Sequence, residues 1–301
     1  AWEGAERLWV HGESRPKACD PLFAAWQKAG QLQDEVVWAR LLKAFDARQR
    51  SLMTYVARKG SDDLQPWSER LLQAYVNPDQ MKSRLAPSDN PRAADIVAHG
   101  TAYFARYRPE AALAQWQYFQ ARMAFSAEQQ ALAERELALR SLFARSAANL
   151  DWVEAALARL NDDLLVEVRM RWALEEQDWQ ALAANLQKLS SEGKAQPAWR
   201  YWRAVLFERS GDRALAEALF RELAAERDYY GFLAADPAVS VQPPGRQPDC
   251  GAHGAAAGAA CGAANRRTLP SRQGKPGALR VVPGAADDHR RGAGGAGGIG
   301  R

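Results

Sequence analysis

The chain has 301 residues, which is enough for one or two domains with a sizeable hydrophobic core. Its formal net charge of +4 belongs to the C-terminal part, because residues 241–301 carry nine Lys and Arg against three Asp, while the first 240 residues carry 31 basic and 33 acidic ones. A basic patch that recruits nucleic acid is expected on a folded face, so this distribution predicts no nucleic-acid partner.

The chain carries no signal for membrane insertion, metal binding or redox chemistry. No run of about 18 apolar residues occurs, so no transmembrane segment is predicted. An amphipathic pattern starts at Ala1, which predicts no signal peptide and indicates a mature product or a fragment. The three cysteines form no C-x-x-C pair, so we expect no metal and no cofactor. Cys19 is expected to be a small buried hydrophobe, with half of a disulfide as the alternative; Cys250 and Cys261 lie near the C-terminus.

Apolar residues recur with helical spacing from the beginning of the chain. Helices are predicted at residues 2–10, 20–30, 34–45, 51–59 and 65–75. Asp20 and Asp34 are expected to cap the second and third of these helices. Gly60 and the prolines at 78, 87 and 91 mark the connections that follow.

The helical pattern strengthens from residue 92 onward. Helices are predicted at about 92–105, 109–122, 127–146, 149–160, 163–176 and 178–190. The Asp162-Asp163 pair and Asp178 are expected to cap helices, and residues 191–194 to form a loop. A last hairpin is predicted within 197–235, joined at residues 210–212. No window alternates with a period of two, so the sequence predicts no strands and an up-and-down array of about fourteen helices.

Small and large residues recur at fixed offsets in two hairpins about a hundred residues apart. In the last hairpin they are Ala204 with Phe207 and Ala216 with Phe220, and in the earlier one Gly100 with Tyr103 and Ala112 with Trp116. Small residues allow two helices to approach closely, and large ones fill the space between hairpins. The pattern predicts an all-α fold, a TPR-like α-solenoid of antiparallel hairpins with roughly 34 residues per repeat.

The composition changes abruptly near residue 240. All eleven Trp lie at or before Trp202, and residues 240–301 are rich in Gly, Ala, Arg and Pro. We expect a superhelical domain at 1–239 and a tail at 240–301 that is either disordered or non-native. Translation in the wrong reading frame is the preferred explanation, because aromatic residues and helical periodicity are lost at one point.

The sequence contains no recognisable catalytic motif. Gly292 to Gly297 match G-x-G-x-x-G, but neither the preceding strand nor the following helix that this motif needs is predicted. Four pairs of adjacent carboxylates begin at Asp34, Asp62, Asp162 and Glu175. Neighbouring side chains point about 100° apart on a helix, so caps and solvated faces are the expected roles of these pairs. His11 and His99 have no partner at ligand or triad spacing and are expected to be ordinary hydrogen-bonded side chains.

Aromatic and arginine side chains are the remaining candidates for a binding surface. Aromatic residues gather around the last hairpin, where a glycan-contacting groove is one hypothesis and core packing the favoured one; they are Trp199, Tyr201, Trp202, Tyr229, Tyr230 and Phe232. Scattered arginines suggest a face for an anionic polymer, although pairing with Glu at i±4 is the favoured interpretation; they are Arg40, Arg122, Arg135, Arg140, Arg145, Arg169, Arg171, Arg200, Arg203 and Arg221.

Two segments resemble the helical domain of soluble lytic murein transglycosylases. Residues 1–30 carry A-W-x-G-A-x-x-L-W followed by S-x-P-x-A-C-D-x-L-F-x-x-W. Residues 198–235 carry W-R-Y-W-x-A, then A-x-A-x-x-x-F/L, then a tyrosine-rich turn before A-A. The resemblance implies a superhelical domain, followed in family members by a linker and a lysozyme-like catalytic domain.

The resemblance also implies an activity and a location. Such proteins act in the periplasm on peptidoglycan, cleaving the MurNAc–GlcNAc bond without water to give a 1,6-anhydro product. A single Glu in an E-S pair followed by G-L-M-Q acts as acid and then as base. Here the only E-S pair is Glu13-Ser14, with no G-L-M-Q after it. We therefore predict no catalytic residue, no cofactor-binding residue and no metal ligand in this chain.

The sequence thus predicts the superhelical part of a soluble lytic murein transglycosylase, truncated and inactive alone. Its expected partners are peptidoglycan glycan strands, reached through the intact enzyme, and cell-wall proteins. Missing upstream helices are implied, with a partner cysteine for Cys19 among them. The alternative function is a stand-alone helical-repeat adaptor that binds a protein or peptide.

Overall fold

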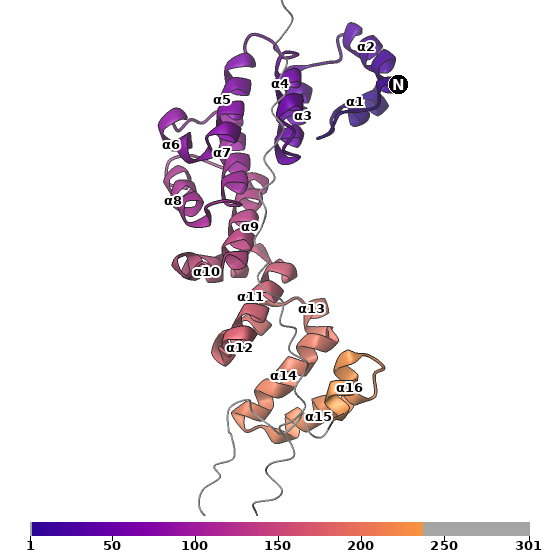
Figure 1. Cartoon of the computed structure of the whole chain (residues 1–301), viewed down its shortest axis with the longest axis vertical. Coiled ribbons are helices and arrows are strands. Elements are labelled where there is room, and N and C mark those ends of the chain that lie inside the picture. Colours follow the sequence, from indigo (N-terminus) through magenta and orange to yellow (C-terminus); the bar gives the residue numbers. More distant parts are fainter. Residues whose placement is uncertain (1, 237–301) are drawn as a thin grey trace, which may run out of the picture. The chain divides into compact units, whose positions relative to one another are not determined.

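The computed structural model describes residues 2–236, and the regular elements of this range are all helical (Figure 1). The first ten elements are α1 (Glu3–Trp9), η1 (Lys17–Cys19), α2 (Asp20–Lys28), α3 (Asp34–Asp46), α4 (Arg50–Ala57), α5 (Gln65–Val76), η2 (Pro78–Gln80), α6 (Met81–Arg84), α7 (Pro91–Phe104) and α8 (Pro109–Gln120). The rest are α9 (Ala127–Phe143), η3 (Ala147–Asn149), α10 (Leu150–Leu160), α11 (Asp163–Glu176), α12 (Trp179–Lys188), α13 (Ser191–Ala195), α14 (Pro197–Ser210), α15 (Arg213–Ala224) and α16 (Tyr229–Ala235). The predicted tail lies outside the described residues, as do its glycine motif and cysteines.

Each helix packs mainly against its neighbours in the chain. Helix α3 contacts α4, α11 contacts α12, and α14 contacts α15, which in turn contacts α16. Contacts also skip one helix: α7 lies against α5 and α9, and α9 lies against α11. Contact with the nearest and next-nearest helix is the packing of an α-solenoid, so the predicted all-α array of helical hairpins is confirmed.

The buried apolar residues form three clusters that follow one another along the chain. The first extends from Ala5 to Leu137, the second from Ala138 to Trp199, and the third from Tyr201 to Leu223. None of the eleven Trp is exposed, which confirms that core packing is their main role.

The small residues with repeated offsets lie where helices approach most closely. Ala112 and Ala204 are fully buried. At Gly100, a Cβ would stand 2.4 Å from the sulfur of Met81, at the flexible end of that side chain. The missing Cβ of Gly100 thus leaves room beside α7 for the Met81 side chain.

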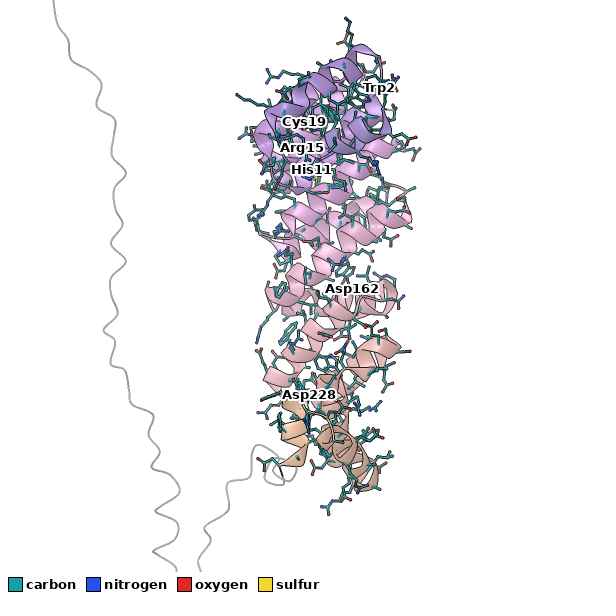
Figure 2. All side chains as sticks on the ribbon, turned by 90° about the vertical axis from the view of Figure 1, so that its right-hand side faces the viewer. Trp2, His11, Arg15, Cys19, Asp162 and Asp228 are labelled. Carbon is teal, nitrogen blue, oxygen red and sulfur yellow. The ribbon has the colours of Figure 1, made fainter. Side chains whose placement is uncertain are left out.

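Asp side chains begin several helices. Asp162 accepts hydrogen bonds from the N–H groups of Leu164 and Leu165, and Asp228 accepts one from Gly231 at 2.8 Å (Figure 2). Asp178 and Asp212 cap α12 and α15 in the same way. These side chains satisfy N–H groups that have no carbonyl partner within the helix.

Other sequence-based boundaries were wrong. Asp20 and Asp34 are the first helical residues of α2 and α3 rather than their caps. Residues 191–194, predicted as a loop, belong to the short helix α13, which Ser190 caps. The tyrosine-rich turn is the beginning of α16, so the described range holds sixteen α-helices rather than about fourteen. Cys19 is free and half-buried, not fully buried.

We predict that Gly231→Ala destabilises the α15–α16 hairpin by about 1–3 kcal/mol. A Cβ at this position would stand 2.2 Å from the carbonyl oxygen of Glu226 and 2.8 Å from that of Leu223, and backbone atoms cannot move aside as a side chain does. Urea unfolding followed by circular dichroism measures the change.

The matched control is Gly4→Ala in α1, where a Cβ has no heavy atom within 4 Å. This variant should be at least as stable as the parent, since Ala favours a helix more than Gly does. Equal unfolding midpoints for the two variants would contradict the prediction.

Candidate functional site

Adjacent carboxylates turn to separate partners rather than toward a common point. Asp162 caps α11 and accepts from Arg135, whereas Asp163 accepts from Ser190. Glu175 pairs with Arg145 in the segment after α9. These carboxylates thus hold the fold together, in agreement with the capping and surface roles predicted for them.

An Asp–Ser clamp occurs twice with the same spacing of 27 residues. The carboxylate of Asp34 accepts hydrogen bonds from both the N–H and the hydroxyl of Ser61, and that of Asp163 accepts the same pair of bonds from Ser190. Each serine also accepts a hydrogen bond from the N–H three residues later, from Leu64 and from Gly193 respectively. The clamp therefore joins the start of α3 to the segment that follows α4, and the start of α11 to the segment that follows α12.

Glu154 of α10 is the centre of a cross-helix network. Its carboxylate accepts from Arg169 Nε at 2.7 Å, from Lys188 Nζ at 2.6 Å and from the amide of Asn185 at 3.2 Å. Arg169 is buried, and Asn185 is fully buried. Burial pushes the pKa of Glu154 up, but the bonds from Lys188, Asn185 and Arg169 outweigh it and hold the pKa below its ordinary value.

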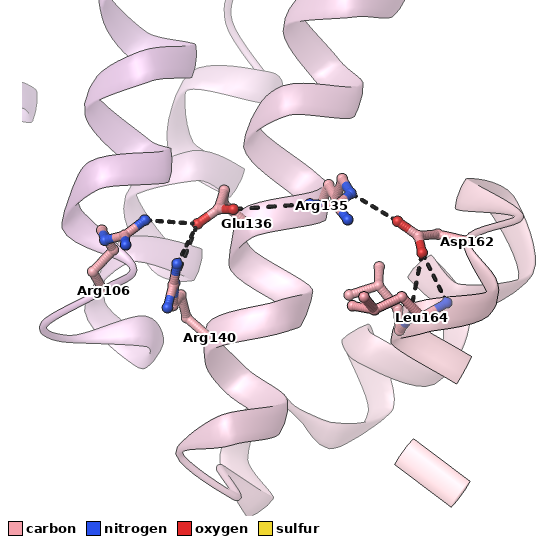
Figure 3. A network of polar contacts seen from close by, with 7 residues as sticks. Arg106, Arg135, Glu136, Arg140, Asp162 and Leu164 are labelled. Atoms are coloured by element: carbon pink, nitrogen blue, oxygen red, sulfur yellow. Dashed lines mark hydrogen bonds and ion pairs between the residues drawn. The ribbon is translucent and has the colours of Figure 1, made fainter. Parts of the chain in front are cut away.

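Glu136 of α9 collects a second network (Figure 3). Its carboxylate lies 3.3 Å from Arg106 Nη1, 3.0 Å from Arg140 Nη2 and 4.0 Å from Arg135 Nη1. Arg135 also binds Asp162 at 2.7 Å, so the network extends from the end of α7 to the start of α11. The Glu136 carboxylate therefore serves as the ion-pair partner of three guanidinium groups.

Four of the ten arginines considered for an anionic polymer pair with carboxylates on other elements, which the sequence-based i±4 interpretation missed. Only Arg140 and Arg171 pair with a glutamate four residues away. Four others reach carboxylates on other elements: Arg135 with Asp162, Arg145 with Glu175, Arg169 with Glu154, and Arg200 with Glu222 and Glu226. The six arginines of these pairs thus have carboxylate partners, which favours ion pairing within the fold as their role.

The histidines have ordinary hydrogen bonds, as predicted. His99 Nδ1 lies 2.6 Å from a carboxylate oxygen of Asp46, and His11 Nδ1 accepts from the N–H of Glu13 at 3.1 Å. Within residues 2–236, no three His, Cys, Asp or Glu side chains gather as metal ligands would. No helix of this range is both long and apolar enough to cross a membrane.

The aromatic residues of the last hairpin are in contact, as the sequence indicates. The ring of Tyr201 packs against those of Trp202, Phe220 and Tyr230 at 5.5–5.7 Å. Two rings of α16 instead face solvent, since Tyr229 is 69% and Phe232 70% exposed. They are candidate contact residues on this part of the chain.

An apolar cavity of about 540 Å³ lies between α12 and α14. Its lining includes Trp179, Leu186, Leu206 and Phe207, and the guanidinium of Arg209 lies 4.0 Å from the centroid of the Trp179 ring. A partly exposed indole beside a cation is suited to stack on a planar or sugar ring. We refer to it as the α12–α14 cavity.

Known proteins similar to this chain are soluble lytic transglycosylases. It is 29% identical to the soluble lytic murein transglycosylases of Escherichia coli K12, over 246 residues, and of Salmonella typhimurium, over 248 residues. Both matches cover 78% of this chain and 37% of the relative. No family model matches the chain.

Solved structures agree. An inactive mutant of the lytic transglycosylase Slt from Pseudomonas aeruginosa superimposes with a TM-score of 0.69 at 32% identity. The 70-kDa soluble lytic transglycosylase in complex with bulgecin A gives 0.68 at 27% identity. Each match covers 78% of this chain and 38% of the solved one, so the chain spans little more than a third of the length of its relatives.

We predict that the Asp34 clamp stabilises the fold above about pH 4 and that this contribution is lost on acidification. Burial tends to raise the pKa of Asp34, but the bonds from Ser61 and the charge of Arg92 bring it below its ordinary value of 3.8. A carboxyl group whose pKa is lowered by folding stabilises the fold above its unfolded pKa, and the effect disappears as the pH falls through the folded pKa.

The measurement is thermal unfolding between pH 5 and pH 2. The variant Asp34→Asn should lose less stability over this interval than the parent, while Asp62→Asn, in an exposed turn nearby, should follow the parent. Parallel acid curves for the parent and Asp34→Asn would contradict the prediction.

We predict that Glu154→Gln lowers the free energy of unfolding by about 1.5–3 kcal/mol, the range for hydrogen bonds to charged groups. The change leaves buried Arg169 without its carboxylate, and uncompensated buried charge is costly. The control Glu167→Gln removes the partner of exposed Arg171 and should cost about 0.5 kcal/mol or less. Urea denaturation of both variants checks this, and equal losses would count against it.

Proposed function

Because the matched 78% of this chain belongs to the soluble lytic murein transglycosylase family, we propose that the chain supplies the helical-repeat scaffold of such an enzyme. The agreement of sequence and fold over one continuous helical array carries the proposal. The superhelical domain occupies residues 1–239, and residues 240–301 are a non-native tail produced by a shifted reading frame.

The proposed reaction of the intact enzyme is non-hydrolytic cleavage of the MurNAc–GlcNAc bond of peptidoglycan in the periplasm, with a 1,6-anhydro product. Its relatives are named for murein, and one was solved with bulgecin A. Two carboxylates support a scaffold role, since Glu154 and Glu136 each form ion pairs with side chains from other parts of the array. Glu13, of the single E-S pair, is exposed in the segment between α1 and α2.

We propose that the helical surface guides glycan strands or partner proteins toward the catalytic part of the intact enzyme. The α12–α14 cavity and the exposed rings of Tyr229 and Phe232 are the surfaces that suit this role, because aromatic faces stack on sugars. We propose no catalytic residue within this scaffold.

The test combines resequencing of the gene with an assay of peptidoglycan cleavage. We expect a single-base correction within or after the codons for residues 230–260 to open a frame that encodes a linker and an E-S…G-L-M-Q domain. The corrected protein should release 1,6-anhydro-muropeptides from purified sacculi, as measured by chromatography and mass spectrometry. The 301-residue chain, assayed in parallel, should release none.

Two outcomes would overturn the proposal. Release of anhydro-muropeptides by the 301-residue chain would show that it carries catalytic machinery of its own. A corrected or confirmed frame that encodes no catalytic domain would remove the enzyme that this scaffold is proposed to serve.

A further inference from the structure

A cavity of about 520 Å³ lies among the first four α-helices. We refer to it as the N-terminal cavity. Trp9 of α1, Phe23 of α2, Arg40 of α3 and Tyr55 of α4 contribute to its lining, together with Arg15 from the segment between α1 and α2. Figure 2 labels Arg15 toward the N-terminal end of the described helices. The volume falls in the range of small-molecule sites.

Arg40 is a buried cation without a carboxylate partner in the described part of the chain. The residue is 4% exposed, and its Nε has no hydrogen-bond partner. Its guanidinium lies 4.5 Å from the centroid of the Trp9 ring, at cation–π distance. A cation–π contact offsets part of the cost of burying a charge, but it leaves the Nε–H donor unsatisfied.

The charges around Arg40 make the deficit larger. Arg15 and Lys59 also line the N-terminal cavity, whereas Asp20, on the exposed surface of α2, is the one acidic residue in the lining. The Nε of Arg15 is buried and unpartnered as well. Burial lowers the pKa of Arg40, the interaction with Tyr55 raises it in part, and the nearby positive charge of Arg15 lowers it again. An oxyanion between the two guanidinium groups would relieve both the repulsion and the missing hydrogen bonds.

Apart from the polar Ser14, Gln27 and Ser51, the rest of the lining is apolar or aromatic. Phe23, Leu52 and Ala24 line the N-terminal cavity, and the ring of Tyr55 is 49% exposed beside it. A bare phosphate or chloride ion would leave most of this volume and apolar surface unfilled. The site therefore suits an anion attached to a ring-sized body, with the fork of Arg40 facing a planar carboxylate.

We propose that the N-terminal cavity binds a sugar that carries a carboxylate, with the carboxylate on Arg40 and Arg15 and the ring against Phe23 and Tyr55. The need for an organic anion comes from the cavity itself; the choice of a sugar rests on the proposed function. N-acetylmuramic acid has this chemistry, and N-acetylglucosamine has the same ring without the acid.

Isothermal titration calorimetry on the full 301-residue chain tests the ligand class. N-acetylmuramic acid should bind at least tenfold more tightly than N-acetylglucosamine and than inorganic phosphate. Absence of binding, equal binding of the two sugars, or tighter binding of phosphate would each overturn the proposal.

Substitutions test the site. Arg40→Met keeps an unbranched apolar stem over Trp9 but removes the charge, so it should weaken binding of N-acetylmuramic acid at least tenfold. Arg15→Met should weaken it as well, and it carries the test if Arg40→Met fails to give the parent circular dichroism spectrum. The matched control is Arg122→Met, since Arg122 also lies over a ring, 4.1 Å from the centroid of Tyr118, but outside this cavity.

Binding by the control variant should equal that of the parent. Parent-like binding by both Arg40→Met and Arg15→Met would place the ligand elsewhere and overturn the proposal. The calorimetric result is independent of peptidoglycan cleavage, so failure here is distinguishable from failure of the proposed function, which is read from the gene and from muropeptide release.

Discussion

No helix in this array can bury its apolar face alone, and the rest of the structure follows from that constraint. Helices of 4 to 17 residues are at best marginally stable on their own in water, so each depends on the hairpins on either side. Close packing needs small residues at the contact, such as Ala112 and Ala204, with a large side chain such as Trp116 filling the remaining space. A fully buried tryptophan of this kind contributes several times the stabilisation of a single hydrogen bond.

Polar groups near these contacts have to be satisfied between helices. Glu134 is almost fully buried and accepts from Gln120, Gln130 and Arg159, which lie on three different helices. Such groups link neighbouring helices in a fixed register, because breaking one of these hydrogen bonds leaves a buried charge without a partner in a low-dielectric interior. Against this background of paired carboxylates and guanidinium groups, the unpaired Arg40 stands apart, and it lies beside a cavity.

The sequence was sufficient for the fold class, for the helical hairpins and for the caps at Asp162 and Asp178, because these depend on local periodicity and on residues within one turn. It failed at Asp34, whose carboxylate is drawn away from its own helix by Ser61. Long-range partners of this kind leave no local signal. The first turn of α13 was missed for the same reason, since Ser190 is anchored by Asp163.

The candidate sites were less predictable than the fold. Arg40 stood in the sequence among ten similar arginines, and nothing in its neighbours along the chain distinguishes it from paired Arg169. Its character depends on side chains from α1 to α4 that meet only after folding. Likewise, Trp179 and Arg209 are thirty residues apart, and their stacking requires α12 to lie beside α14.

The boundaries between the three core clusters fall inside helices rather than in loops. Leu137 and Ala138, neighbours in α9, belong to the first and second clusters, and α14 carries Trp199 of the second and Tyr201 of the third. Each of these helices therefore extends across the boundary between two core clusters. A pulling force on one cluster passes to the next through a continuous ladder of backbone hydrogen bonds, so the array resists tension at the points where its side-chain packing is divided.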